Sequence, residues 1–226
     1  MGKRLSQKAQ RQINQNRKAR LQRIRYGGIA LIFIVATAWI VSWRNAAVAP
    51  DTELIIHTHL TGPANAPVQI VEYADLTCSA CRQWHNLGFK EQLFAEFGDQ
   101  INFEFRHFPV ITPSSPTGAE AAQCASEQDG FWSFHDFIYE NLEPYPNLST
   151  TRVQEIAAAV GLDRAAFASC LESGRYQSFP HQAIQQAQAD GVRGTPTFFI
   201  NGQQVPTSYM AMSAVINNLL ENEFQE

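Results

Sequence analysis

Two cysteines separated by two residues stand where an apolar run gives way to a helix-compatible segment. The stretch Val68–Cys81 (VQIVEYADLTCSAC) begins as a short run rich in apolar, β-branched and aromatic residues, which predicts a strand, whereas Arg82–Phe97 predicts a helix. A pair with the spacing of Cys78 and Cys81 can cycle between dithiol and disulfide. At a helix N-terminus, free N–H groups and the helix dipole favour the thiolate of Cys78. The pattern therefore predicts a redox-active dithiol, with a structural disulfide or half of a zinc site as alternatives.

Cys78 is the predicted nucleophile and, in the oxidised state, the sulfur that a substrate thiolate attacks. The most stable thiolate is also the best leaving group, so a low pKa favours the reduced protein and makes its disulfide oxidising. Cys81 lies one turn into the helix and is expected to be the shielded, resolving thiol. A closed zinc site would need a second close ligand pair, but Cys124 and Cys170 are isolated in the sequence.

Three other ionisable residues lie near this pair. Alternation along the strand places Glu72 on one face with Ile70 and Ala74. Desolvation in such a strand would raise the pKa of this carboxyl, and the alternative is an acid at a strand edge. Asp75 is interpreted as a turn or capping residue. His85 falls one turn past Cys81, where an exposed helix histidine is favoured over a partner of the thiolate.

The rest of the chain predicts an alternating α/β architecture. Ile101–Val110 predicts a second strand parallel to the first, Thr197–Asn201 and Gln203–Val205 a hairpin, and Met210–Phe224 a closing helix. Between them, helical patterns cover 118–128, 131–142, 150–160, 163–173 and 176–189. The order β-α-β, helices, β-β-α predicts a thioredoxin-like fold with four strands over residues 63–226 and a helical insertion at about 114–190.

Ahead of this domain lies a predicted linker, residues 44–62. Within it, Glu53–Leu60 could add a short edge strand that points His57 and His59 to one face, as zinc ligands would point. No further ligand is close in the sequence, so an exposed edge is the preferred interpretation.

Charge divides the chain sharply. Residues 1–44 carry ten Lys and Arg and no Asp or Glu, whereas residues 45–226 carry 7 Lys and Arg against 21 Asp and Glu. The basic residues 1–26 predict a solvated cytoplasmic tail, which is favoured over a nucleic-acid-binding arm. These two parts of the chain are therefore expected to face different surroundings.

Between the two parts, Gly27–Trp43 runs for 17 residues without a charge. At 1.5 Å per residue it would be about 25 Å long, enough for a short transmembrane helix. Because most flanking positive charges precede it, the N-terminus is expected in the cytoplasm and the acidic domain outside. The competing interpretation is a signal peptide cleaved near Ala47-Val48-Ala49, for which the basic region is long.

Three motifs in order give the chain a resemblance to a known family. They are E-Y-x-D-x-x-C-x-x-C from Glu72, C-A-S-E-Q-x-x-F-W-x-F-H-D over Cys124–Asp136, and G-V-R-G-T-P-T-F-F-I-N-G over Gly191–Gly202. Over about residues 60–226 the chain resembles the DsbA-like branch of thioredoxin-fold proteins, specifically its membrane-anchored bacterial members. It departs from many members in having Ser79-Ala80 between the cysteines instead of a proline after the first.

The resemblance implies roles for residues outside the dithiol. It implies that Glu72 lies beneath the active site and handles protons for Cys81. It also implies a cis bond at Thr195-Pro196, packed against the two cysteines, with Thr195 pairing to the substrate backbone. The residues themselves add that Pro196 precedes an apolar run, which fits the entry to a strand beside which a substrate strand could add.

Cys124 and Cys170 each fall in a predicted helix of the insertion. Outside the cytoplasm two remaining thiols usually pair, so a structural disulfide between them is predicted. It would close a loop of nearly fifty residues and stabilise the protein by about 3–4 kcal/mol. The alternative is a pair of buried apolar cysteines.

These observations favour a membrane-anchored, monomeric oxidoreductase without a bound cofactor. It would oxidise cysteine pairs in unfolded exported proteins through Cys78 and Cys81, and the resemblance implies reoxidation by a quinone-linked membrane partner. The alternatives are a reductase or isomerase that uses the same dithiol, and a non-catalytic tethered binding module. No residue pattern identifies the physiological substrates.

Overall fold

The computed structural model describes residues 59–223. The predicted tail, membrane anchor and most of the linker, including His57, lie outside the described residues. Within residues 59–223, none of the helices combines the length and the apolar character needed to cross a bilayer.

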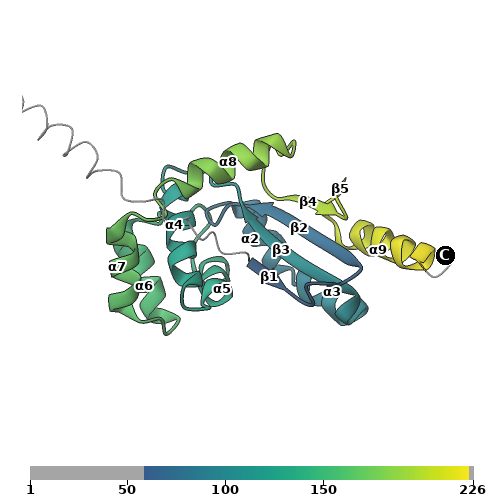
Figure 1. Cartoon of the computed structure of the whole chain (residues 1–226), viewed down its shortest axis with the longest axis horizontal. Coiled ribbons are helices and arrows are strands. Elements are labelled where there is room, and N and C mark those ends of the chain that lie inside the picture. The colour runs from purple at the N-terminus through teal and green to yellow at the C-terminus, as the bar shows by residue number, and fades with distance from the viewer. Residues whose placement is uncertain (1–58, 224–226) are drawn as a thin grey trace, which may run out of the picture. The chain divides into compact units, whose positions relative to one another are not determined.

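A mixed five-stranded sheet forms the centre of the domain (Figure 1). Its strands follow the order β1-β3-β2-β4-β5, and β2 and β3 pair in parallel, whereas the other neighbours are antiparallel. The bounds are β1 His59–Thr61, β2 Val68–Ala74, β3 Ile101–His107, β4 Thr197–Ile200 and β5 Gln203–Val205. The sheet therefore holds the four predicted strands and β1, the described end of the suggested edge strand.

The crossover from β2 to β3 contains two helices where one was predicted. They are α2, Ser79–Asn86, and α3, Phe89–Phe97, and a short 3-10 turn follows at Gly98–Gln100. Gly88 between them has φ 67°, in the left-handed region that ends a helix and that glycine adopts at little cost. The helix carrying the cysteines is therefore an independent two-turn element that α3 does not extend.

The helical insertion is confirmed, with α4 Ser115–Ser126, α5 Phe131–Asn141, α6 Thr150–Ala159, α7 Arg164–Ser173 and α8 Phe179–Ala189. Local residues set where three of these helices begin. Pro116 and Pro180 lie in the first turns of α4 and α8, and Asp163 Oδ1 accepts hydrogen bonds from the first free N–H groups of α7. The last helix is α9, Tyr209–Glu223. In Figure 1, α4–α7 gather at one end of the sheet and α9 lies at the other.

The apolar core has parts on both faces of the central strand β2. On one face, Ile70 packs with Trp84 of α2 and Leu93 of α3, and Ala74 packs with the insertion. On the other face, Val71 and Tyr73 pack with α8. A strand covered on both sides is apolar along nearly its whole length, which is why VQIVEYA contains so few polar residues.

The expectation of an exposed edge was wrong for His59. Its ring is buried, stacks on Phe131 of α5 with centroids 3.5 Å apart, and has its Nε2 3.2 Å from Nε2 of His107 and 3.1 Å from the amide of Gln123. Although β1 is the edge strand of the sheet, α4 and α5 of the insertion cover it. The linker composition gave no sign of that cover.

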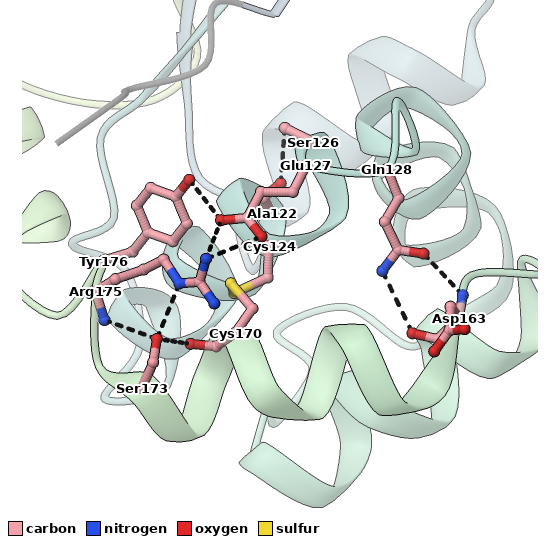
Figure 2. The surroundings of a disulfide bond; sticks show 10 residues. All are labelled: Ala122, Cys124, Ser126, Glu127, Gln128, Asp163, Cys170, Ser173, Arg175 and Tyr176. Atoms are coloured by element: carbon pink, nitrogen blue, oxygen red, sulfur yellow. Dashed lines mark hydrogen bonds and ion pairs between the residues drawn. A yellow bond between two sulfur atoms is a disulfide. The ribbon is translucent and has the colours of Figure 1, made fainter.

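A disulfide joins Cys124 of α4 to Cys170 of α7, with their Cα atoms 5.8 Å apart (Figure 2). Both residues are buried. Beside the bond, Glu127 accepts hydrogen bonds from Arg175 at 3.1 Å and from the hydroxyl of Tyr176 at 2.9 Å. The covalent link and these polar contacts together fasten the end of α7 to α4.

Replacing both cysteines of this bridge with alanine should lower the free energy of unfolding by about 4 kcal/mol, because the unfolded chain loses a cross-link between residues 46 apart. Urea unfolding would measure the change. Both the parent and the variant would carry Cys81→Ala, so that the Cys78–Cys81 pair contributes nothing to the difference. A loss below about 1 kcal/mol would contradict the assigned stabilising role.

Candidate dithiol active site

Cys78 occupies the N-cap of α2, with extended backbone angles of φ −79° and ψ 122°. A tight turn brings the chain there from β2, because the N–H of Cys78 donates to the carbonyl of Asp75 at 2.8 Å. The carbonyl of Cys78 in turn accepts from the N–H of Arg82 at 3.0 Å and starts the helix. The sulfur thus lies where the first free N–H groups of the helix point.

Interactions at this position lower the pKa of Cys78 from 9.0 to about 6. The largest cause is a hydrogen bond from the Cys81 thiol, which stabilises the thiolate, and partial burial opposes it. The side chain of Thr195 and the backbone N–H groups of Cys81 and Ala80 lower the pKa further. Thr195 Oγ1 is buried and has no hydrogen-bond partner within the described residues.

Cys81 has the opposite environment. It is fully buried, and desolvation is the main reason that its pKa lies well above 9.0; its hydrogen bond to Cys78 and the charge of Glu72 act in the same direction. Both cysteines are free thiols in this structure. The pair therefore divides into a sulfur that ionises easily and a sulfur that holds its proton.

Glu72 lies in the middle of β2 and is only 3% exposed. Its Oε1 has no hydrogen-bond partner within the described residues. Desolvation raises its pKa to about 8, Lys90 partly offsets this rise, and Cys78 adds to it. The alternative of an acid at a strand edge was wrong, because β2 has neighbours on both sides.

Asp75 is buried and holds the turn before Cys78. Its Oδ1 accepts hydrogen bonds from the N–H and the hydroxyl of Thr77, at 2.8 and 2.9 Å, and its Oδ2 accepts from the N–H of Ile111 at 2.8 Å. The carboxylate thereby fixes the loop after β3 to the loop that carries Cys78. This arrangement agrees with the turn role expected from the sequence.

The Thr195-Pro196 bond is cis and precedes β4 directly. The thiol of Cys78 donates to the carbonyl of Thr195, with sulfur and oxygen 3.5 Å apart. Because β4 pairs with β2 and Tyr73 is opposite Thr197, the sheet itself places this loop beside the cysteines. The structure thus brings Cys78, Cys81, Glu72, Thr195 and Pro196 into one region.

His85 is less exposed than expected. Its side chain is 10% exposed and lies between α2 and α5, with Nε2 3.9 Å from Asp136 and 3.7 Å from Glu140. The expectation of an exposed histidine on α2 was therefore wrong. Among the described residues, His85 forms no hydrogen bond or ion pair with Cys78.

Two residues at the site escaped the sequence interpretation. Tyr139 of α5 is buried, donates to the carbonyl of Asp75 at 3.1 Å, and has a pKa raised well above 10.0, chiefly by burial and next by Cys81. Lys90 of α3 acts on the charge of Glu72. Tyr139 comes from a helix distant in sequence from the cysteines, whereas Lys90 lies on the helix that follows α2, and neither residue stands out within its helical pattern.

Replacing Glu72 with glutamine should flatten the pH dependence of stability of the reduced protein. The raised pKa means that the contribution of Glu72 to the free energy of unfolding is fully present below about pH 4.5 and is lost as the pH rises through about 8. An amide does not ionise, so the free energy of unfolding of Glu72→Gln should not fall in this range as that of wild type does. Between pH 5 and pH 9, the difference in free energy of unfolding between variant and wild type should therefore shift in favour of the variant by more than about 1 kcal/mol. Urea unfolding at each pH measures this.

The matched control is Glu91→Gln, whose side chain is 59% exposed on α3. Its stability should follow that of wild type across the range. Parallel pH profiles for Glu72→Gln and wild type would show that the buried carboxyl does not titrate in this window.

Comparison with known proteins gives relatives of two kinds. The chain is 28% identical over 194 residues to the Na(+)/H(+) antiporter NhaA of Herminiimonas arsenicoxydans, which covers 81% of this chain and 30% of the antiporter. It is 29% identical over 170 residues to a probable disulfide bond formation protein D of Bacillus cereus, which covers 71% of this chain and 77% of that protein. The chain thus spans less than a third of the length of the antiporter relative.

Solved structures with this fold include oxidised BdbD from Bacillus subtilis, with a TM-score of 0.66 at 20% identity over 73% of this chain and 93% of that chain. Chlamydia trachomatis DsbA has a TM-score of 0.63 at 17% identity, over 78% and 98% of the two chains. A family model described as Thioredoxin matches residues 55–218, well over half of the sequence. The chain therefore belongs to the thioredoxin family, and its fold is the DsbA-like form with a helical insertion.

Proposed function

We propose that this chain is a protein thiol–disulfide oxidoreductase that oxidises cysteine pairs in exported proteins. The observation that carries the proposal is the unequal acidity of the two thiols. The pKa of Cys78 is lowered to about 6, whereas that of Cys81 is raised well above 9.0. A pair of this kind gives one good leaving group and one thiol that accepts a proton.

The reaction starts from the oxidised pair. A substrate thiolate attacks Cys78 Sγ, a new S–S bond forms, and the bond to Cys81 breaks with its electron pair on the Cys81 sulfur. This thiolate takes up a proton, and Glu72, whose pKa of about 8 keeps it largely protonated at neutral pH, is the proposed donor. Because the pKa of Cys81, well above 9.0, exceeds that of Glu72, the proton passes from the carboxyl to the sulfur.

In the second step, the other substrate thiolate attacks the substrate sulfur of the mixed disulfide. The bond to Cys78 breaks and Cys78 leaves as the thiolate that α2 and Cys81 stabilise. The substrate has lost two electrons and gained a disulfide. The protein has taken up these two electrons, and its cysteine pair is now the reduced dithiol. The carbonyl of Thr195 lies 3.5 Å from Cys78 Sγ, so a substrate strand that binds beside Pro196 presents its cysteine to this sulfur.

The setting proposed for this activity is the outer side of a cell membrane. Residues 27–43 would anchor the chain, residues 1–26 would stay in the cytoplasm, and a quinone-linked membrane partner would reoxidise the dithiol. The Cys124–Cys170 bridge supports this setting, because structural disulfides persist in oxidising compartments. The relative from Bacillus cereus, a probable disulfide bond formation protein, supports the direction of the reaction.

Alkylation of Cys78 by iodoacetamide should follow a thiolate that titrates near pH 6. In Cys81→Ala the largest cause of the low pKa is gone, so the midpoint should move upward, toward 9.0. The rate constant against pH measures both midpoints. Gln83→Ala, an exposed change on α2, should leave the midpoint near 6. A wild-type midpoint near that of a free thiol would sink the proposal.

The equilibrium of Cys78–Cys81 with glutathione should give a potential nearer to −120 mV than to −270 mV, because a stabilised Cys78 thiolate favours the reduced state.

Cys81→Ala should accumulate mixed disulfides with exported proteins, which mass spectrometry would identify. Cys78→Ser/Cys81→Ala should accumulate none. A potential near −270 mV would favour a reductase, and unchanged oxidation activity in Cys78→Ser would favour a binding module.

A further inference from the structure

We infer that His85, His135 and Asp136, together with Glu140, form a binding site for a zinc-type divalent cation. One donor atom from each of the first three lies within 4.8 Å of the others, the only group of this kind within the described residues. His85 comes from α2, whereas His135, Asp136 and Glu140 come from α5. The site would therefore join the helix that carries the dithiol to the helical insertion.

The donors converge on one small region. Nε2 of His85 is 3.9 Å from Oδ1 of Asp136 and 3.7 Å from Oε1 of Glu140. Nδ1 of His135 is 2.7 Å from the same oxygen of Asp136. Tetrahedral zinc ligands at about 2.0–2.1 Å from the ion lie roughly 3.3 Å apart, so small side-chain movements suffice to enclose an ion.

His135 provides a second, independent observation. Its ring is buried, yet its Nε2 has no hydrogen-bond partner within the described residues. Buried polar atoms are nearly always paired, and an ion is one of the partners that such an atom finds. Because its Nδ1 is hydrogen-bonded to Oδ1 of Asp136, Nε2 is the nitrogen that would bind the ion, and the bond to Asp136 orients the ring.

The kinds of ligand select the kind of ion. Two imidazoles and one or two carboxylates suit zinc and other late transition metals, whereas Ca²⁺ and Mg²⁺ prefer oxygen ligands alone. Glu140 is 60% exposed and Asp136 37%, so the cluster is open to solvent and to an entering ion. Lys90 lies close enough to influence Asp136, but its ammonium group sits 4.3 Å over the Trp132 ring and 3.6 Å from Glu91.

Zinc binding is best tested on the full-length chain, purified in mild detergent without a histidine tag. The Cys78–Cys81 pair is first oxidised, since free thiolates would bind zinc themselves. Calorimetric titration should show one Zn²⁺ per chain, and Zn²⁺ should raise the melting temperature. His85→Asn and Asp136→Asn should each weaken the affinity at least about tenfold and reduce that rise.

The matched control is His181→Asn, an exposed histidine on α8, which should bind Zn²⁺ as wild type does. Melting temperatures without zinc establish that each variant folds. Absence of binding by the oxidised wild type, or equal affinity in wild type and His85→Asn, would overturn the inference. The dithiol is locked throughout, so either result leaves the proposed redox function untouched.

Discussion

The interaction between the buried thiol of Cys81 and the sulfur of Cys78 is the one on which the site depends. It is the largest cause of the lowered pKa of Cys78, and it also raises the pKa of Cys81. One interaction thus separates the two sulfurs into different chemical roles. This interaction requires a helix that starts at Cys78. Cys81 then lies one turn further along the helix, and the free N–H groups of the first turn point toward the sulfur of Cys78.

The rest of the domain maintains that start of the helix. Asp75 closes the turn before it, Tyr139 of the insertion donates to the Asp75 carbonyl, and the loop before β4 presents Thr195 to Cys78. Beneath these contacts, Glu72 remains buried between sheet and helices at a cost to stability. Buried groups with strongly shifted pKa values are frequent at functional sites. The insertion is therefore part of the site's support as well as an addition to the fold.

Sequence patterns predicted the elements well where the signal was local. The apolar run of β2, the spacing of the cysteines and the proline before β4 each reflect a constraint carried by neighbouring residues. Contacts between distant segments were not predictable in this way. His59 looked like a residue of an exposed edge because nothing near it in the chain reveals that α5 covers it. Tyr139 and His85 escaped for the same reason, since their environment depends on how α2 packs on α5.

The bridge between α4 and α7 has a consequence for how the molecule matures. A newly made chain carries four reduced cysteines, and two of them must be joined before the insertion gains its covalent brace. A protein that is proposed to form disulfides in other proteins therefore needs one formed in itself first. The supply of finished molecules would then depend on an oxidant that was present before them, whether an older copy or a separate partner.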